Sequence, residues 1–190
     1  MKKSNLVTAV LMTIATTILF GIFYPLVVTA LAQLLFPKQA NGQLIRRGDQ
    51  VIGSRLIAQP FTSARYFHPR PSAAGNGYDA ANSGGSNLGP TNQKLLDRVR
   101  AAVVVAQAEN PNVPVPADLV TTSGSGLDPD VSPAAAYFQV PRVARARAIS
   151  EERLRELVAA HIQERTIGIL GEPRVNVLEL NLSLDGTAGR

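Results

Sequence analysis

The sequence contains no cysteine and only two histidines among its 190 residues. The lack of cysteine excludes a disulfide-stabilised scaffold, a thiol nucleophile and any zinc finger. The two histidines, His68 and His161, are too far apart in the chain to form the H-E-x-x-H motif of metalloproteases. Thiol chemistry is therefore excluded, and zinc chemistry has no evident set of ligands.

Charged residues are missing from one long segment, because none lies between Ser4 and Pro37. Of the 31 residues in Leu6–Phe36, 23 are apolar. As a helix this segment would reach roughly 46 Å, against a hydrocarbon core of ~30 Å. The sequence therefore predicts a transmembrane helix over residues 6–36.

The ends of this segment leave one alternative open. Lys2 and Lys3 precede it and Ala30-Leu31-Ala32 resembles a signal-peptidase box, so a cleaved secretory signal would release a free periplasmic binding protein. The uninterrupted apolar run Leu6–Tyr24 is longer than the ~7–15 residues of a signal core. We therefore favour an uncleaved anchor.

Basic residues flank the segment at both ends, so the positive-inside count alone does not set its orientation. Lys2 and Lys3 favour a cytoplasmic N-terminus, although three basic residues also follow the segment. A long following domain can be exported despite such charge. We expect residues 1–5 to be cytoplasmic and residues 37–190 to form an extracytoplasmic (periplasmic) domain.

A row of small residues runs along the predicted membrane helix. Ala9, Thr13, Thr17 and Gly21 recur at every fourth position, which permits close approach of another helix. Pro25 lacks a backbone donor and should kink the helix. The row predicts a contact with a partner inside the membrane, although small residues also fall at such positions by chance.

Beyond the membrane segment the composition is that of a globular domain, and its patterns predict an α+β fold in which helices pack on a small sheet. Thr91 or Asn92, Ser132 and Ser150 are candidate helix caps, and Pro141 should break or kink the second helix. The clearest strand signal is the alternation of leucine with polar residues over 178–184. The expected elements are a linker or hairpin over 41–50, a strand over 54–59, a long loop over 62–92, helices over 92–109, 133–148 and 151–165, and a strand over 174–184.

The candidate motifs for binding a metal ion or a phosphate group are incomplete. Asp128, Asp130 and Ser132 imitate the start of a calcium loop, but Pro133 replaces its glycine and Gln139 its final glutamate. The glycine-rich run at 83–90 lacks the lysine and hydroxyl of a P-loop. No nucleophile elbow or acid–base pair is present, so we expect no catalytic residues and no cofactor or metal of the chain's own.

Charge is unevenly distributed along the domain. Residues 37–100 carry nine basic and three acidic side chains, whereas residues 101–190 carry eight and eleven. Phosphate binding would need the basic residues on one face with stacking aromatics, which the sequence does not indicate. A solvated surface, or docking to an acidic partner, explains the pattern better than nucleic-acid binding.

Several motifs then occur in an order that resembles the KdpC family, the C subunits of bacterial potassium-transporting Kdp P-type ATPases. The resemblance extends over nearly the whole chain behind the single N-terminal anchor. The motifs are Tyr24-Pro25-Leu26, Tyr66-Phe67, Arg70-Pro71-Ser72-Ala73, the run from Ser83 to Asn92, the run from Val120 to Pro129, Ser132-Pro133-Ala134, Arg142-Val143-Ala144-Arg145, and the run from Val175 to Leu182.

This resemblance implies an accessory, single-pass subunit of the bacterial inner membrane. Its partners would be a potassium-binding channel-like subunit and an ATP-hydrolysing subunit, so ATP and potassium would be handled by the complex. The family is described as a catalytic chaperone that raises the ATP affinity of the ATP-hydrolysing subunit. Because a periplasmic domain cannot touch cytosolic ATP, such an effect would have to pass through the membrane helices.

The resemblance also indicates a loop that docks on the partners. We expect the loop to use residues of the motifs between 66 and 92. They are Tyr66, Phe67, Arg70, Ser86, Asn87, Gly89 and Asn92.

Overall fold

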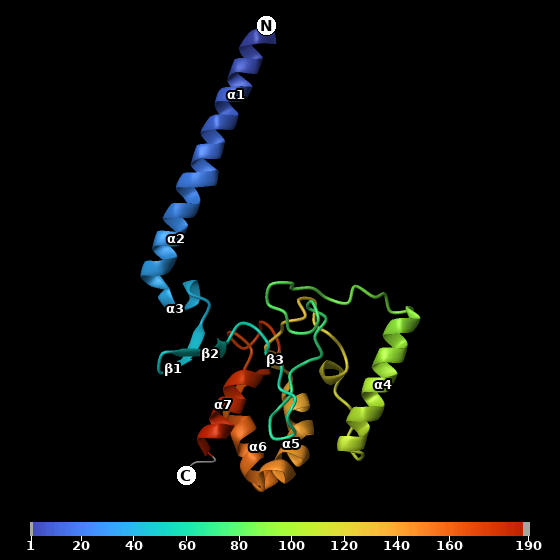
Figure 1. The fold of residues 1–190 in the computed structure, drawn as a ribbon. Helices are drawn as coiled ribbons and strands as arrows, with labels where there is room; N and C mark the ends of the chain where they lie inside the picture. Colours follow the sequence, from blue (N-terminus) through green and yellow to red (C-terminus); the bar gives the residue numbers. More distant parts are fainter. Residues whose placement is uncertain (1, 188–190) are drawn as a thin grey trace. The chain divides into compact units, whose positions relative to one another are not determined.

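The computed structural model describes residues 2–187 and divides into two compact units, Met1–Ile52 and Gly53–Arg190 (Figure 1). The first unit begins with a continuous helical rod made of α1 (Lys2–Ile18), a π-helical turn (η1, Leu19–Phe23) and α2 (Tyr24–Leu35). Ser4–Leu35 is long and apolar enough to cross a membrane, with a mean hydropathy of 2.3. A helix over residues 6–35 of the predicted 6–36 is thus confirmed.

The π turn lies directly before Pro25. The Tyr24 amide donates to the Leu19 carbonyl, five residues back instead of four. A wider turn at this point accommodates a residue that cannot donate a backbone hydrogen bond. Pro25 therefore changes the helical register rather than ending the helix.

After the membrane segment comes a short connector. It contains α3 (Pro37–Ala40) and a hairpin of β1 (Leu44–Arg47) and β2 (Gln50–Ser54). This confirms the hairpin interpretation of residues 41–50. The strand predicted over 54–59 is wrong, because Ser54 Oγ accepts a hydrogen bond from the Leu56 amide at 3.1 Å and the chain turns there.

The second unit contains four α-helices and a small sheet. The helices are α4 (Gln93–Glu109), α5 (Pro133–Arg147), α6 (Glu151–Ala160) and α7 (Val177–Thr187). The strands β3 (Asp130–Val131), β4 (Ile162–Gln163) and β5 (Arg174–Asn176) pair antiparallel in the order β3-β5-β4. A 3₁₀ turn, η2, covers Ala117–Leu119. The α+β class is confirmed.

The hydrophobic core lies where α5, α6 and α7 pack together with β5 (Figure 1). Pro141 does not break α5, because its neighbours Val140 and Val143 are fully buried and hold both halves of the helix in this core. Helix α6 ends at Ala160, earlier than predicted, where the His161 ring bonds the Leu157 carbonyl at 2.8 Å and the chain enters β4.

The largest correction concerns residues 174–184, predicted as one strand. The strand ends at Asn176 and α7 begins immediately after it. Asn176 Oδ1 accepts a hydrogen bond from the Glu179 amide at 3.1 Å, which is the bond an N-cap makes. Leucine and glutamate are good helix formers, so the alternating run becomes helical once it is capped.

Residues 62–92 contain no helix or strand, as the loop prediction stated. The loop is nevertheless fixed by hydrogen bonds. Ser72 Oγ, for example, donates to the Gly126 carbonyl at 2.6 Å and accepts from the Tyr78 amide at 2.8 Å. Residues 62–92 therefore form an ordered loop.

Candidate functional site

Two buried amide side chains hold the backbone at Phe67 and His68. Asn181 of α7 accepts a hydrogen bond from the Phe67 amide and donates one to the Phe67 carbonyl, both at 2.9 Å. Gln139 of α5 does the same for His68, at 2.7 and 3.1 Å. Each side-chain amide thus satisfies one backbone N–H and one backbone C=O, at the fully buried Phe67 and at the half-buried His68.

Two arginines of α5 hold the preceding turn. Arg142 donates to the carbonyls of Ala64 and Tyr66 at 2.8 and 3.0 Å and pairs with Glu109 at 3.0 Å. Burial lowers the pKa of Arg142, and the Glu109 carboxylate opposes this effect. These cations are therefore used inside the domain rather than presented to a ligand.

The second of these arginines is Arg147, whose side chain is only 3% exposed. It pairs with Asp185 at 2.7 Å and lies over the Tyr66 ring, 4.7 Å from its centroid. The Tyr66 hydroxyl donates to the same Asp185 at 3.1 Å. Tyr66 is thereby fastened to the end of α7.

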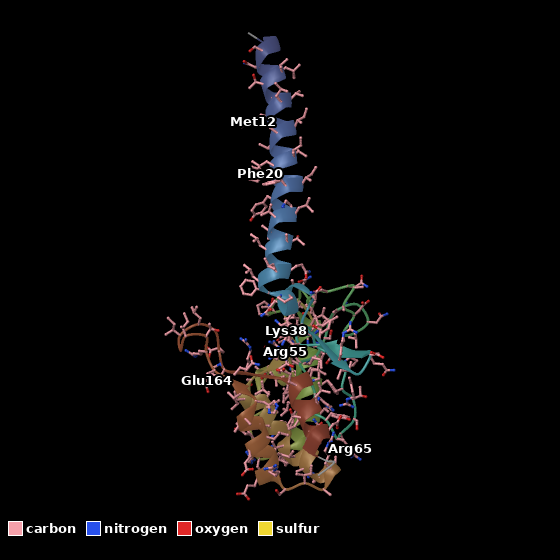
Figure 2. All side chains as sticks on the ribbon, turned by 90° about the vertical axis from the view of Figure 1, so that its left-hand side faces the viewer. Met12, Phe20, Lys38, Arg55, Arg65 and Glu164 are labelled. Carbon is pink, nitrogen blue, oxygen red and sulfur yellow. The ribbon has the colours of Figure 1, made fainter. Side chains whose placement is uncertain are left out.

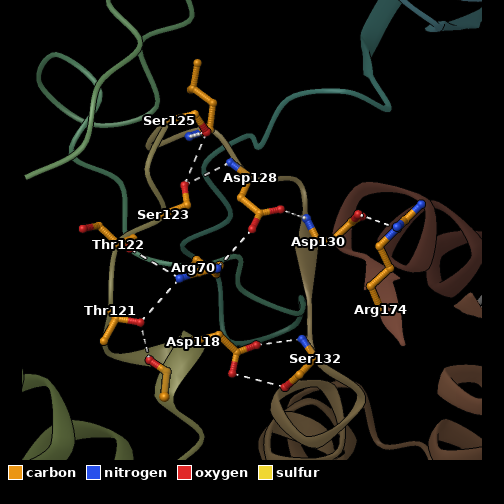
Figure 3. A network of polar contacts seen from close by, with 12 residues as sticks. Arg70, Asp118, Thr121, Thr122, Ser123, Ser125, Asp128, Asp130, Ser132 and Arg174 are labelled. Atoms are coloured by element: carbon orange, nitrogen blue, oxygen red, sulfur yellow. Dashed lines mark hydrogen bonds and ion pairs between the residues drawn. The ribbon is translucent and has the colours of Figure 1, made fainter. Parts of the chain in front are cut away.

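A polar cleft of about 600 Å³ lies between Arg70 and the segment from Asp118 to Ser132 (Figure 3). Arg70 pairs with Asp128 at 3.1 Å, and Asp118 accepts from the amide and the hydroxyl of Ser132 at 2.7 and 3.2 Å. The Arg70 Nε is buried without a hydrogen-bond partner. Ser132 also caps α5 by accepting a hydrogen bond from the Ala135 amide at 3.1 Å. The N-terminus of α5 therefore lines one part of the cleft.

Asp130 lies at the edge of this cleft. Its carboxylate pairs with Arg174 at 3.0 Å (Figure 3). It also accepts a hydrogen bond from the Asn176 side chain at 3.1 Å. Burial raises the pKa of Asp130, while Asn176 and Arg174 act in the opposite direction. Within residues 2–187 no three histidine, aspartate or glutamate side chains gather where they could hold a metal ion.

The glycine-rich run packs against residues 123–126 of the same segment. The Gly84 amide donates to the Ser125 carbonyl at 2.8 Å. A Cβ on Gly126, whose φ is +68°, would lie 2.6 Å from the Gly84 carbonyl oxygen, and a Cβ on Gly85 would lie 2.9 Å from the Gly124 oxygen. Because they have no Cβ, these glycines let the two backbone segments pack closely together. This packing gives the run a structural role, which is the alternative to a phosphate-binding loop.

Helix α4 borders a second, more apolar cavity. It has about 570 Å³ and separates α4 from α5 and from the 61–69 segment. No α4 residue is buried, and Val104 and Val105 are 70% and 65% exposed. At the C-terminal end of α4, Glu109 pairs with Arg142 at 3.0 Å and its carbonyl accepts a hydrogen bond from Arg145 at 3.5 Å. The Asn110 side chain donates to the Phe138 carbonyl at 3.1 Å.

The structure separates the seven predicted docking residues into three places. Tyr66 and Phe67 contact α7, Arg70 lines the polar cleft, and Ser86, Asn87 and Gly89 lead to Asn92, which caps α4 through the Lys94 amide at 2.9 Å. Phe67 is completely buried, so it supports the loop from the core instead of touching a partner. The docking role of the exposed members stays a prediction.

The predicted row in the membrane helix is exposed along its length. Thr13 donates its hydroxyl to the Ala9 carbonyl at 2.9 Å, so its polar group is satisfied within the helix. A Cβ on Gly21 would meet the Thr17 methyl at 3.8 Å, an ordinary contact distance, which places Thr17 and Gly21 on one stripe. A contact between this stripe and a partner stays a prediction.

Sequence reasoning missed the two amides that organise the site, Gln139 and Asn181. A polar residue inside an apolar helical face is the signal that could have found Gln139. Asn181 had no such signal, because the strand prediction placed it on a solvent-facing side.

These features define a class of protein: an α+β domain on one helix of membrane-spanning length, with its charged and amide groups used mainly in internal contacts. The sequence matches the family described as K⁺-transporting ATPase, c chain (KdpC), over residues 6–186. This chain belongs to that family.

Curated relatives agree over nearly their full length. The potassium-transporting ATPase KdpC subunit of Koribacter versatilis is 63% identical over 97% of this chain and 96% of its own length. The KdpC subunits of Methylobacterium nodulans and Rhodospirillum rubrum are 59% and 61% identical, over 93% and 90% of this chain and 94% and 90% of their own.

Proposed function

We propose that this chain is an accessory subunit of an ATP-driven, high-affinity potassium uptake complex, without catalytic chemistry of its own. The main observation behind the proposal is the near full-length match to KdpC, in a chain whose described residues, 2–187, include one helix of membrane-spanning length. Its partners are a potassium-binding channel-like subunit and an ATP-hydrolysing subunit. Its role is to support the assembly and stability of the complex in the bacterial inner membrane.

The topology belongs to the same proposal. The N-terminus is cytoplasmic and the domain from residue 37 onward lies outside, because Lys2 and Lys3 precede the apolar span. An effect on ATP affinity, as a catalytic chaperone exerts it, then reaches the cytosol through helix contacts in the membrane. The stripe of Ala9, Thr13, Thr17 and Gly21 is the surface for such contacts.

The test is recovery of the other subunits with the tagged chain from mild detergent. Replacing Thr17 and Gly21 with leucine adds bulk to the stripe and should lower recovery several-fold, together with potassium uptake. The matched control is Ala15→Leu with Ala30→Leu, which adds similar bulk off the stripe. Unchanged assembly and uptake in the Thr17/Gly21 variant would remove the stripe from the proposal.

A cleaved, free binding protein is the second candidate, favoured by the Ala30-Leu31-Ala32 sequence. The intact mass of the mature protein separates the two. A mass that includes residues 1–32 supports the anchored subunit, whereas a mass starting at Gln33 supports the free protein.

A further inference from the structure

The connection between β4 and β5 extends beyond the sheet as a small hairpin, residues 164–172. Its two sides are joined at Thr166 and Leu170, each of which donates its amide to the other's carbonyl, at 2.9 and 3.0 Å. Figure 2 labels Glu164 at this hairpin, which projects away from the helices of the domain. The hairpin is therefore an ordered projection rather than a loose connection.

The tip of this hairpin is apolar and open to solvent. Ile167, Ile169 and Leu170 are 81%, 73% and 56% exposed. In sequence they are interrupted only by Gly168, and the tip from Thr166 to Gly171 carries no charge. Contiguous exposed apolar side chains on a domain with a well-formed core mark an interaction surface.

The backbone of the tip is held in an uncommon conformation. Ile167 and Gly168 have φ values of +52° and +78°, and the Ile169 amide closes the turn on the Thr166 carbonyl at 3.3 Å. A positive φ is unfavourable for a β-branched residue, since its branched Cβ crowds the backbone. Asparagine or glycine would adopt the same turn without strain. Formation of the turn therefore does not explain why residue 167 is an isoleucine.

We propose that Ile167, Ile169 and Leu170 dock into an apolar pocket on another subunit of the potassium-transporting complex. This inference rests on the proposed function. A strained, shaped tip suits a pocket of matching shape, because preorganisation lowers the entropy cost of docking. A fluid bilayer gains from apolar area of any shape and would not need a fixed turn.

The charges around the tip also favour a protein pocket over lipid. Arg165 and Glu172 pair at 2.5 Å across the base of the hairpin, and Glu164 adds a second carboxylate beside them. Carboxylates disfavour contact with anionic headgroups, and the tip has none of the tryptophan, tyrosine or lysine residues that anchor proteins at a membrane surface. The rim of the pocket should therefore carry basic side chains.

The lack of cysteine makes a direct test possible. Ile169→Cys introduces a single thiol that can carry an environment-sensitive fluorophore, and the labelled full-length chain is placed in phosphatidylcholine/phosphatidylglycerol nanodiscs. We expect a blue shift of the emission only after the other subunits are added. A blue shift in the chain alone would mean that the tip enters lipid, and no shift in the assembled complex would mean that it docks nowhere; either result overturns the proposal.

A variant separates docking from folding. Ile167→Asn removes the apolar side chain and relieves the positive-φ strain, so the thermal midpoint of the isolated chain should stay equal or rise. Co-purification of the other subunits should nevertheless weaken by roughly tenfold, the loss expected for one hot-spot side chain. Val104→Asn, at a similarly exposed position on α4, is the matched control and should leave co-purification unchanged.

The same experiments separate a failure of the proposed function from a failure of the hairpin docking. If the unaltered chain recovers no other subunit, the proposed function fails. If the unaltered chain recovers them and Ile167→Asn does so equally well, only the docking of the hairpin fails.

Discussion

Helices α4 and α7 occupy one domain but contribute to it in opposite ways. All of the 17 residues of α4 keep at least part of their surface in solvent, whereas α7 buries Val177, Leu178, Leu180, Asn181 and Leu184 within 11 residues. Figure 1 shows α7 against α5 and α6, and α4 at the other side of the domain. A helix can therefore be well formed without being part of the core.

The two helices also differ in what fixes them. α7 is held by apolar burial and by the two hydrogen bonds of Asn181 to the Phe67 peptide groups. α4 is held at its C-terminal end by polar contacts of Glu109 and Asn110. Burial gives stability roughly in proportion to apolar area, whereas a partly exposed ion pair gives little. We therefore expect α7 to open only with the whole domain and α4 to open locally.

The largest expected effect comes from removing core volume in α7. Leu180 is fully buried, so Leu180→Ala should lower the free energy of unfolding by about 3 kcal/mol. Val104→Ala, on the exposed face of α4, should change it by less than about 0.5 kcal/mol. Denaturant unfolding of both variants measures the contrast, and equal losses would show that α4 belongs to the core after all.

Breaking the contact that fastens α4 should have an intermediate effect. Glu109→Ala leaves the Arg142 guanidinium, 11% exposed, without its carboxylate. A loss of about 1–2 kcal/mol is expected, because the carboxylate side is one third exposed and solvent screens part of the interaction. Hydrogen exchange should accelerate in α4 and stay unchanged in α7; acceleration in both would contradict a local contact.

A smaller effect is expected at the start of α4. Asn92 accepts a hydrogen bond from the Lys94 amide, so Asn92→Ala should cost about 1 kcal/mol of local helix stability. Amide exchange in the first turn of α4 reports this loss. Asn92→Ser keeps a capping oxygen and is the control, which should exchange like the unaltered chain.

The smallest effect concerns His68, which lines the apolar cavity between α4 and α5. Burial and the nearby Arg142 lower the pKa of His68 from its usual 6.5. Below pH 6.5 the unfolded chain takes up a proton that the folded chain resists, so this group reduces stability as the pH falls from 7.5 towards 5.5. His68→Gln should flatten the unfolding free energy over that range; an unchanged slope would exclude His68 as its source.

Local signals explain what could be predicted of this fold. Asn92, Ser132 and Ser150 each accept a backbone hydrogen bond from the first turn of the helix that follows, as their types and positions predict. Such bonds depend on a few neighbouring residues and are visible in sequence. The membrane helix is equally visible, because it depends on the absence of charge over one continuous segment.

Non-local contacts explain what was missed. The alternating leucines after Asn176 satisfy a strand pattern and a helix pattern alike, and the Asn176 cap together with burial in the core shared with α5 and α6 selects the helix. Phe67 was expected at a docking surface but is buried, since its neighbours in space, such as Asn181, lie more than a hundred residues away. Sequence identifies the loop as important without showing which of its side chains face outward.

The connector between α2 and the domain, residues 36–52, has a consequence for how strong the docking of the domain needs to be. A domain tethered to a membrane helix stays near any subunit that binds that helix. Its docking then behaves as an intramolecular reaction, with an effective concentration on the order of millimolar for a short linker. Contacts of the domain that are too weak to hold two separate proteins together would then still add to the strength with which the whole chain is held.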